Sequence, residues 1–293
     1  MGKIAIALEK GLQIAYHQAY SDMIKSPEYD LIKRVAMMTR STSDQEKYGW
    51  LGDVPAVREW LGDRLAGKLS EYDYTIKNKN WETSIGIDRN DIEDDKYDMI
   101  MTRVRDMPWA ILAHRWEMIE DLLVNGTTDL SYDGSAFFAD RTAPQDNLLA
   151  GNGADTVANI QTDIKAAYAA MYNFQSDTGR AMRLKMNAIA CPVEIYALML
   201  EAVTSVQGEA TKNVSSMFID TVIPMPNLSD TTDWYGLCTN RQLKPLILQT
   251  RREPEPTLDD TNVKNNRKMV FGADGRSNAG YGFHQMAVKM VNS

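Results

Sequence analysis

The longest alternation of apolar and polar residues runs from Tyr74 to Asp88, in YTIKNKNWETSIGID. Trp81 and every second residue after it lie on one face of an extended strand, and the residues between them lie on the other face. Tyr74 and Ile76 have the opposite parity, so we expect a bulge or a strong twist at Asn78–Asn80. Because strands usually contain about 5–6 residues, we expect this long one to leave the body of its own domain.

Apolar residues recur every three or four positions in two other parts of the first half. This spacing predicts an amphipathic helix over residues 4–24, with Pro27 as a helix stop shortly after it. It also predicts a long helix that starts at Asp94 and ends near Gly126. Pro108 falls inside this second pattern and must kink the helix or start a new one.

The patterns of the second half are shorter and are separated by turn residues. The loop 141–155 divides the chain in composition. Beyond it, we expect a helix from Val157 that is capped by Asp155. The other predicted elements are a strand over 130–138 with a turn at Asp133–Gly134, a strand over 183–191, a helix over 192–203, three strands within 216–253 and a closing hairpin over 268–290.

Composition limits the classes of function. The 293 residues carry a net charge of −8, which argues against nucleic-acid binding through a broad basic surface but does not exclude a local basic patch. Two cysteines, Cys191 and Cys238, cannot form a disulfide framework. The apolar run at the N-terminus is too short for a signal peptide, and no stretch reaches the ~20 apolar residues of a membrane span. We therefore expect a soluble, intracellular protein.

Acidic residues cluster where the long strand meets the long helix. A helix–loop–helix calcium site needs glycine at the sixth position of its loop, but that position is Glu93 when counted from Asp88. Helix N-termini favour acids, so we expect Asp94 and Asp95 to cap the helix, with the other acids near its positive end. The alternative is a metal-dependent hydrolase that uses Asp88, Asp91, Glu93 and Asp95.

No other set of residues forms a motif for catalysis or for binding a cofactor or metal. GNGAD at 151–155 has two glycines of a dinucleotide fingerprint but lacks the third. His17, His114 and His284 lie far apart in the sequence without paired ligand spacing. Aromatic residues within 48–81 stand in a glycine-rich setting that offers no regular face to bury, which favours contacts between subunits. We therefore expect no cofactor and no metal.

Several segments, in order along the chain, resemble the major head subunit of Mu-like phages. Residues 48–64 (YGWLGDVPAVREWLGDR) and 74–95 (YTIKNKNWETSIGIDRNDIEDD) carry the most specific similarity, because their tryptophans, glycines and acidic end fall in the family's order. Residues 132–138 and 234–256 and the tail FGADGRSNAGYGFHQMA also fit.

This resemblance implies an α+β protein with the major capsid fold of tailed phages, the Hong Kong 97 type. Such subunits have an N-terminal arm, an extended hairpin called the E-loop, a long spine helix, a peripheral domain and an axial domain. The implied boundaries are 1–47 for the N-terminal arm, 48–93 for the E-loop, 94–150 for the spine helix and peripheral domain, 151–245 for the axial domain and 246–293 for the return to the peripheral domain.

The resemblance also implies a purpose for the long strand, because an E-loop lies across a neighbouring subunit. Some relatives link a hairpin lysine to a neighbour's asparagine; Lys68 lies near the hairpin tip, but no motif for that reaction is present. The residues expected at subunit contacts are Trp60, Leu61, Lys68, Tyr72, Tyr74 and Trp81. The residues expected at the junction of the strand and the spine helix are Asp91, Glu93, Asp94 and Asp95.

The function implied by the resemblance is structural. We expect a non-enzymatic major capsid protein that assembles into hexamers and pentamers of an icosahedral head around double-stranded DNA. Expected partners are other copies of the chain, a scaffold or protease, a portal and decoration proteins, with weak non-specific contact to packaged DNA and none to a membrane. The expected location is the virion, after assembly in the host bacterial cytoplasm. Besides the hydrolase, the alternative is another ring-forming component of a phage head or tail.

Overall fold

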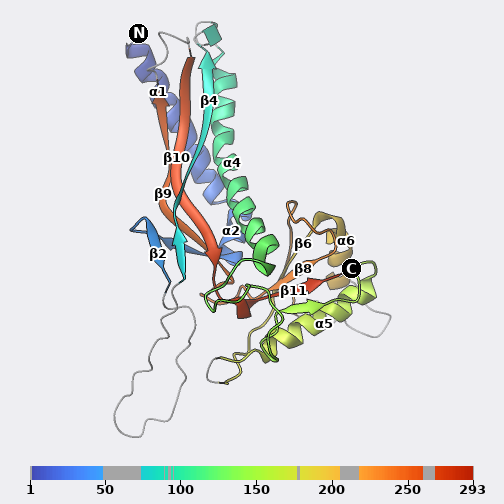
Figure 1. Ribbon diagram of the computed structural model, residues 1–293. Coiled ribbons are helices and arrows are strands. Elements are labelled where there is room, and N and C mark those ends of the chain that lie inside the picture. The colour runs from blue at the N-terminus through green and yellow to red at the C-terminus, as the bar shows by residue number, and fades with distance from the viewer. Residues whose placement is uncertain are drawn as a thin grey trace.

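The computed structural model of the chain describes residues 2–48, 74–88, 90–91, 94, 96–176, 179–204, 218–259 and 268–292. These residues form an elongated lobe and a second lobe beside one of its ends (Figure 1). The elongated lobe contains helices α1 (Gly2–Ile24), α2 (Pro27–Val35) and α4 (Tyr97–Val124) and strands β1 (Ala36–Arg40), β2 (Gln45–Lys47), β3 (Thr75–Lys77), β4 (Lys79–Asp88), β9 (Leu246–Asp259) and β10 (Lys268–Tyr281). The second lobe contains helices α5 (Val157–Asn173) and α6 (Val193–Thr204) and strands β5 (Leu148–Ala150), β6 (Ala188–Cys191), β7 (Thr221–Pro224), β8 (Trp234–Leu237) and β11 (Ala287–Val291). Two 3-10 helices, η1 (Asn125–Thr127) and η3 (His284–Met286), lie where the chain passes between the lobes.

The elongated lobe is built on a four-stranded sheet in the order β1-β9-β10-β4, which we call the long sheet. β1 runs parallel to β9, whereas β10 runs antiparallel to both β9 and β4. α1 and α4 contact each other and lie along the same face of this sheet (Figure 1). Their apolar stripes meet alternate strand residues, so Tyr16, Val104 and Phe271 are fully buried between the layers.

β9 changes character along its length. Residues 246–250 are all buried, because this half lies where the two lobes meet and is covered on both faces. The other half alternates less regularly and is largely exposed. Its register with β10 shifts on both sides of Arg276, where Arg251 on one side and Glu253 and Pro254 on the other have no partner in the ladder. A proline cannot donate to the ladder, so an irregular point of this kind accommodates it.

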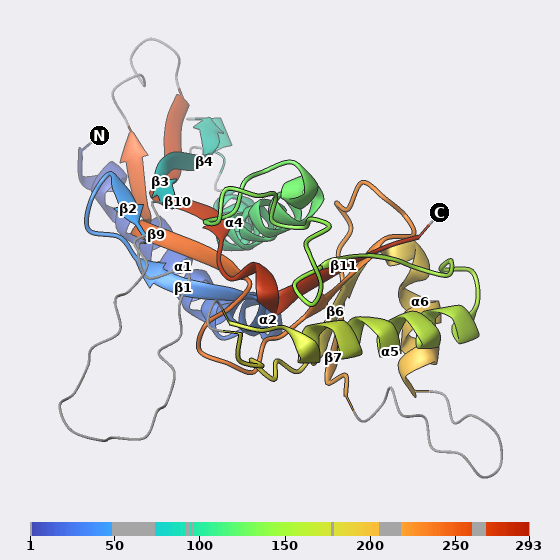
Figure 2. The ribbon, with the colours of Figure 1, turned by 60° about the horizontal axis from the view of Figure 1, so that its bottom comes forward.

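The second lobe contains a five-stranded mixed sheet in the order β5-β11-β8-β6-β7. α5 and α6 contact each other and lie beside this sheet, away from α1 and α4 (Figure 2). Every residue of β6 and β8 is buried, which explains why these strands are short apolar runs without alternation. Trp234, the first residue of β8, is the largest fully buried side chain among the described residues.

The predicted helices are confirmed. α1 covers the first helical pattern, and α4 covers the second and continues through Pro108. α5 and α6 correspond to the two helices expected in the second half. Among the helices of the described ranges, none has the combination of length and apolar character that crossing a membrane requires.

The long strand is divided at Asn78 into β3 and β4, as its change of parity indicates. The expectation that it leaves the body of its own domain is wrong. β4 pairs with β10 from Lys79↔Ser277 to Asp88↔Lys268 and contacts α4. Its apolar face is therefore covered within its own chain.

Several local predictions are also corrected. Pro27 starts α2, where its fixed φ suits the first helical turn. Residues 130–138 contain a single bridge around a turn and no strand. Thr156 caps α5 by accepting a hydrogen bond, in place of Asp155. Residues 268–290 do not form a hairpin, because β10 pairs with β9 and β11 belongs to the other sheet.

His284, the first residue of η3, lies at the joint between the lobes. Its side chain is buried and stacks on the ring of Tyr132, with 5.4 Å between centroids. Its Nδ1 lies 3.9 Å from Asp133 Oδ2, the same oxygen that accepts a hydrogen bond from Arg141 at 3.1 Å. Burial, together with the charge of Arg141, lowers the pKa of His284 to about 3, although Asp133 acts in the opposite direction.

This depressed pKa predicts a loss of stability in mild acid. Between about pH 6.5 and pH 3 the unfolded chain binds a proton that folded His284 does not, so the free energy of unfolding falls as the pH falls. We expect His284 to make the protein about 2 kcal/mol less stable at pH 5 than at pH 7. Urea unfolding of His284→Gln should lack this component, while His17→Gln, at an exposed histidine, should keep it. The same pH dependence in the wild type and His284→Gln would contradict the assignment.

Candidate functional site

Two short strands hold together the ends of the segment 49–73, which lies outside the described residues. β2 and β3 pair antiparallel along their full length and form what we call the stem. The N–H of Tyr48 donates to the carbonyl of Tyr74 at 2.8 Å and extends this pairing by one step. The chain therefore leaves the lobe at Tyr48 and returns beside it at Tyr74, so both ends of the segment are fixed at one place on the surface.

Gln249, fully buried in β9, connects the stem to the long sheet. Its Nε2 donates to Asn78 Oδ1 at 2.7 Å, and its Oε1 accepts from the Tyr48 hydroxyl at 2.7 Å. Asn78 Nδ2 in turn donates to Ser41 Oγ at 2.9 Å. Because these buried polar groups are paired on both sides, the network holds the stem in one orientation. The sequence alone indicated the change of parity at Asn78, but the role of Gln249 was missed. The feature that could have indicated it is the position of this polar residue inside the apolar run PLILQT.

Tyr74 and Trp81, two of the predicted contact residues, make hydrogen bonds within the chain. The hydroxyl of Tyr74 accepts from the N–H of Tyr281 at 2.8 Å. Trp81 Nε1 donates to the carbonyl of Ser277 at 2.9 Å, and its ring lies against His114 with 4.1 Å between centroids. Both side chains are partly buried, so their role at subunit contacts stays a prediction. The other predicted contact residues lie outside the described ranges: Trp60, Leu61, Lys68 and Tyr72.

The acidic junction falls between the end of β4 at Asp88 and the start of α4 at Tyr97. Lys96 occupies the position before the first turn of α4, and among the described residues no side chain caps this helix, so the expected cap by Asp94 is wrong. Asp91 and Asp94 instead face the Lys96 ammonium, with oxygen–nitrogen distances of 2.8 and 3.5 Å. The hydrogen bond to Asp91 raises the pKa of Lys96. Glu93 and Asp95 lie outside the described residues.

A metal site at this junction would need several carboxylates directed at one point. Across the parts of the chain that the structure describes, no group of three His, Cys, Asp or Glu side chains is placed to hold a metal ion. Asp88 accepts a hydrogen bond from the N–H of Asn90 at 2.9 Å, and Asp91 and Asp94 bind Lys96. The described acids of the junction are therefore engaged by a backbone amide and an ammonium group.

Arg115, a buried cation on α4, was missed by sequence reasoning. Its guanidinium donates to Glu253 at 2.7 Å, to the Tyr29 hydroxyl at 3.2 Å and to the Tyr20 hydroxyl at 3.4 Å. Burial acts to lower the pKa of Arg115, but Tyr20, Glu253 and Tyr29 outweigh it and hold the pKa above its ordinary value. This residue joins α4 to α1, α2 and β9. Arg115 stands on the apolar stripe of the helix, and this position was the feature of the sequence that could have indicated a buried cation.

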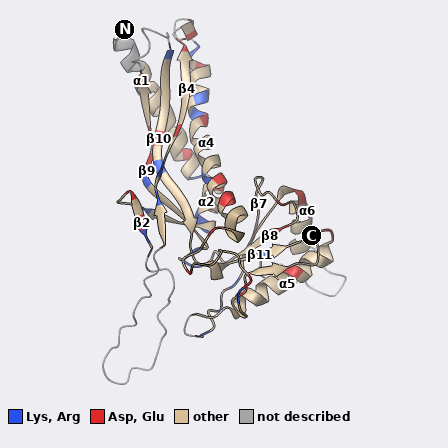
Figure 3. Cartoon of the chain, in the orientation of Figure 1, with Lys and Arg blue, Asp and Glu red and all other residues tan. Residues whose placement is uncertain are grey.

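A groove of about 500 Å³ runs between α4 and the edge of β4 and β10, next to the stem. Trp81, Met118 and Leu122 line it, and Leu130 beside them is 61% exposed. Around it, charges of both signs are interspersed along α4 (Figure 3). The acidic residues that line the groove are Glu117, Asp121 and Asp129.

Known proteins are similar to this sequence over most of its length. Residues 6–168 and 219–292 match the family described as Mu-like prophage major head subunit gpT. The chain is 26% identical over 292 residues to the Mu-like prophage FluMu major head subunit of Haemophilus influenzae, which covers 98% of this chain and 74% of that protein. It is 29% identical over 259 residues to the major capsid protein of Escherichia phage Mu. That alignment covers 87% of this chain and 64% of the phage Mu protein, so the chain spans less than two thirds of that relative's length.

Solved structures share the fold. The procapsid of bacteriophage JBD30 has a TM-score of 0.59 and 26% identity, over 97% of this chain and 75% of that one. A virus-like particle from Pyrococcus furiosus has a TM-score of 0.59 at 11% identity, over 97% of this chain and 99% of that one. At this low identity the similarity concerns the fold and not the function. The expected α+β capsid fold of tailed phages is thus confirmed. The chain belongs to the family of Mu-like prophage major head subunits and is a structural major capsid protein of a phage head, not an enzyme.

Proposed function

We propose that this chain assembles into hexamers and pentamers of an icosahedral head that encloses double-stranded DNA. The observation that carries the proposal is the stem, which holds both ends of residues 49–73 at one point beside the groove. A segment anchored in this way can reach a neighbouring subunit without disturbing its own lobe. Repeated head-to-tail contacts of one kind close into rings, and rings of five and six subunits close into a shell.

The proposed contact places the E-loop of one subunit in the groove of its neighbour. The candidate side chains from the E-loop, 48–93, combine large apolar groups with a cation at Lys68. The groove is lined by apolar and polar side chains, with three acids, Glu117, Asp121 and Asp129, against one cation, Lys79. This match in charge and polarity favours specific pairing and correct register. The proposed contact residues are Trp60, Leu61, Lys68 and Tyr72 on the side of the E-loop, and Tyr74 and Trp81 on the side of the groove, which they line.

The remaining domain assignments follow from the same proposal. Residues 1–47 form the N-terminal arm, and 94–150 form the spine helix with part of the peripheral domain. Residues 151–245 form the axial domain, and 246–293 return to the peripheral domain. The division into two lobes supports the separation of the spine helix from the axial domain, since α4 lies in one lobe and α5 and α6 lie in the other. β5 and β11 pair within the second lobe although they fall outside the proposed axial bounds. Scaffold or protease, portal and decoration proteins are the further partners, and assembly takes place in the host bacterial cytoplasm.

Electron microscopy and sedimentation of the full chain, expressed alone and with its neighbouring genes, test the proposal. We expect icosahedral shells, tubes or ring-shaped capsomers. Deleting Leu65–Asp73 should leave thermal unfolding unchanged but abolish closed shells, because the proposed E-loop tip is lost. Replacing the same residues by a Gly/Ser segment of equal length separates the loss of length from the loss of side chains. Normal shells from the deletion would refute the E-loop assignment, and a monomer or dimer in every condition would refute the assembly.

A further inference from the structure

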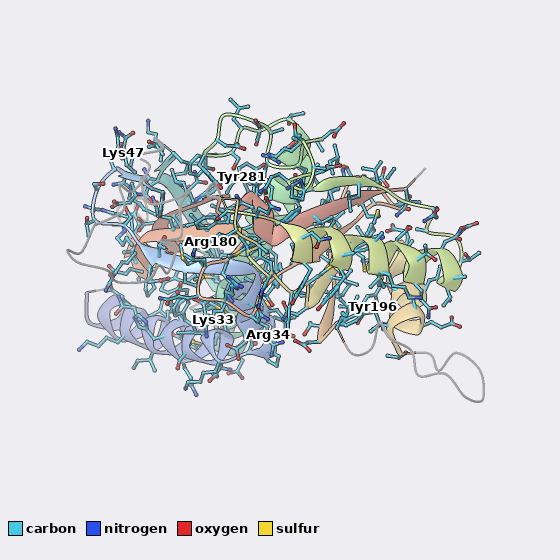
Figure 4. The ribbon with its side chains drawn as sticks, turned by 90° about the horizontal axis from the view of Figure 1, so that it is seen from below. Lys33, Arg34, Lys47, Arg180, Tyr196 and Tyr281 are labelled. Atoms are coloured by element: carbon cyan, nitrogen blue, oxygen red, sulfur yellow. The ribbon has the colours of Figure 1, made fainter. Side chains whose placement is uncertain are left out.

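The groove and the stem share one wall, the end of β10. Residues 278–281 line the groove, and β10 also contacts β3 of the stem. Asn278 Nδ2 donates to the carbonyl of Lys77, the last residue of β3, at 2.8 Å. The N–H of Tyr281, the residue at the end of β10 that Figure 4 labels, donates to the Tyr74 hydroxyl at 2.8 Å. The segment that forms one side of the groove therefore also holds the stem in place.

Gly280 brings the stem into direct contact with this wall. A Cβ at Gly280 would lie 2.5 Å from Cδ1 of Ile76 and 3.0 Å from the Tyr74 hydroxyl oxygen. Ile76, the middle residue of β3, is only 3% exposed. Because buried side chains are close-packed, the stem cannot move away from β10 without uncovering Ile76 and losing these contacts.

The lining of the groove is complete only while the stem is docked on β10. Tyr74, which returns the chain from the segment 49–73, is itself one of the lining residues. The Tyr281 hydroxyl donates to the carbonyl of Leu122 at 2.9 Å and so connects the same wall to α4, on which Leu122 also lines the groove. Local opening of the stem would therefore remove Tyr74 from the groove and release the bonds that hold its wall.

We infer that filling the groove stabilises the docked stem of the same subunit, so that each hairpin contact in a ring strengthens the next one. The inference rests on the proposed function, which places a neighbour's E-loop in the groove. A ligand that needs the complete lining binds the docked state better than the opened one, and by linkage it stabilises the docked state to the same extent. A subunit that has received an E-loop then presents its own from a fixed base, which reduces the entropy lost in the next contact.

The test adds a synthetic peptide of residues 49–73 to the full-length chain, held as unassembled subunits. Hydrogen exchange is followed at the N–H of Tyr48, which donates to the Tyr74 carbonyl and is released when the stem opens. If the peptide binds only while the stem is docked, exchange slows by one plus the ratio of peptide concentration to Kd. At a peptide concentration about ten times Kd, we expect exchange about tenfold slower than without peptide.

The variant Tyr74→Phe with Asn278→Ala removes the hydrogen bonds between the wall and the stem. We expect the slowing to fall below about twofold when the peptide is again about ten times above this variant's own Kd, because the stem then opens without disturbing the groove. The matched control, Tyr172→Phe with Asn173→Ala, makes the same changes at exposed positions of α5 in the second lobe. It should keep the slowing of the wild type.

Each outcome decides the inference. Peptide binding by the wild type without slower exchange, or equal slowing in the variant and the control, overturns it. If the double variant fails to fold, Tyr74→Phe is measured alone and should show less slowing than the wild type. If the wild type does not bind the peptide at all, the E-loop contact of the proposed function fails and the inference fails with it, whereas binding without slowing overturns the inference alone.

Discussion

Replacing Arg115 by methionine is expected to lower the free energy of unfolding by about 2–4 kcal/mol. Methionine fills much of the same volume but donates no hydrogen bond, so the Tyr29 hydroxyl and the Glu253 carboxylate lose their buried donor. The guanidinium also lies over the Tyr29 ring, 5.5 Å from its centroid, and that contact is lost as well. Glu253 is 48% exposed and regains water, which keeps the cost below that of stranding a fully buried charge.

Arg105→Met is the matched control, because Arg105 lies on the same helix with its side chain exposed. We expect that substitution to change the free energy of unfolding by less than about 0.5 kcal/mol. Urea unfolding of both variants gives the comparison. Equal effects of the two substitutions would show that the bonds of Arg115 to α1, α2 and β9 contribute nothing to stability.

Replacing Gly282 by alanine is expected to cost about 2–3 kcal/mol through overpacking against backbone. A Cβ at this position would lie 2.4 Å from the carbonyl oxygen of Lys244 and 3.0 Å from that of Pro245. The N–H of Gly282 also donates to the Pro245 carbonyl at 2.7 Å, so the two segments cannot separate without losing that bond. Gly282 stands between β10 and η3, where the chain passes from one sheet to the other. Strain here therefore acts on the packing of both lobes.

Gly86→Ala supplies the control for this prediction. Gly86 is an exposed residue of β4, and a Cβ there would meet no atom within 4 Å. We expect its effect on the free energy of unfolding to stay within about 0.5 kcal/mol. Thermal or urea unfolding of the two alanine variants makes the comparison, and a Gly282→Ala protein as stable as Gly86→Ala would contradict the close approach.

Local periodicity in the sequence was sufficient for the helices and for the break in the long strand. α1, α4, α5 and α6 repeat apolar residues at helical spacing, and the change of parity at Asn78 marks the passage from stem to long sheet. These features depend on neighbouring residues, which a sequence displays directly. The resemblance to Mu-like head subunits then supplied the fold class, which periodicity alone left at a mixed α/β protein.

The pairing of distant segments could not be predicted in the same way. Nothing in the tail 268–290 distinguishes a hairpin from two strands of different sheets, because the choice depends on partners such as β9 and β8. Gln249 and Arg115 were missed for a similar reason. A polar residue in an apolar run becomes meaningful only when the fold brings its partners to it, here Asn78 and Glu253.

The order of strands in the long sheet determines how much of a newly made chain must be synthesised before that sheet can form. β1 and β4 are synthesised early, yet their partners β9 and β10 belong to 246–281 and leave the ribosome only after most of the second lobe, all but β11 among its strands, has been made. Until then both early strands have open edges, and Gln249 is not there to orient the stem. A chain truncated before Leu246 lacks the two central strands of the long sheet, β9 and β10. Such a chain can neither complete the long sheet nor bond the stem to it through Gln249.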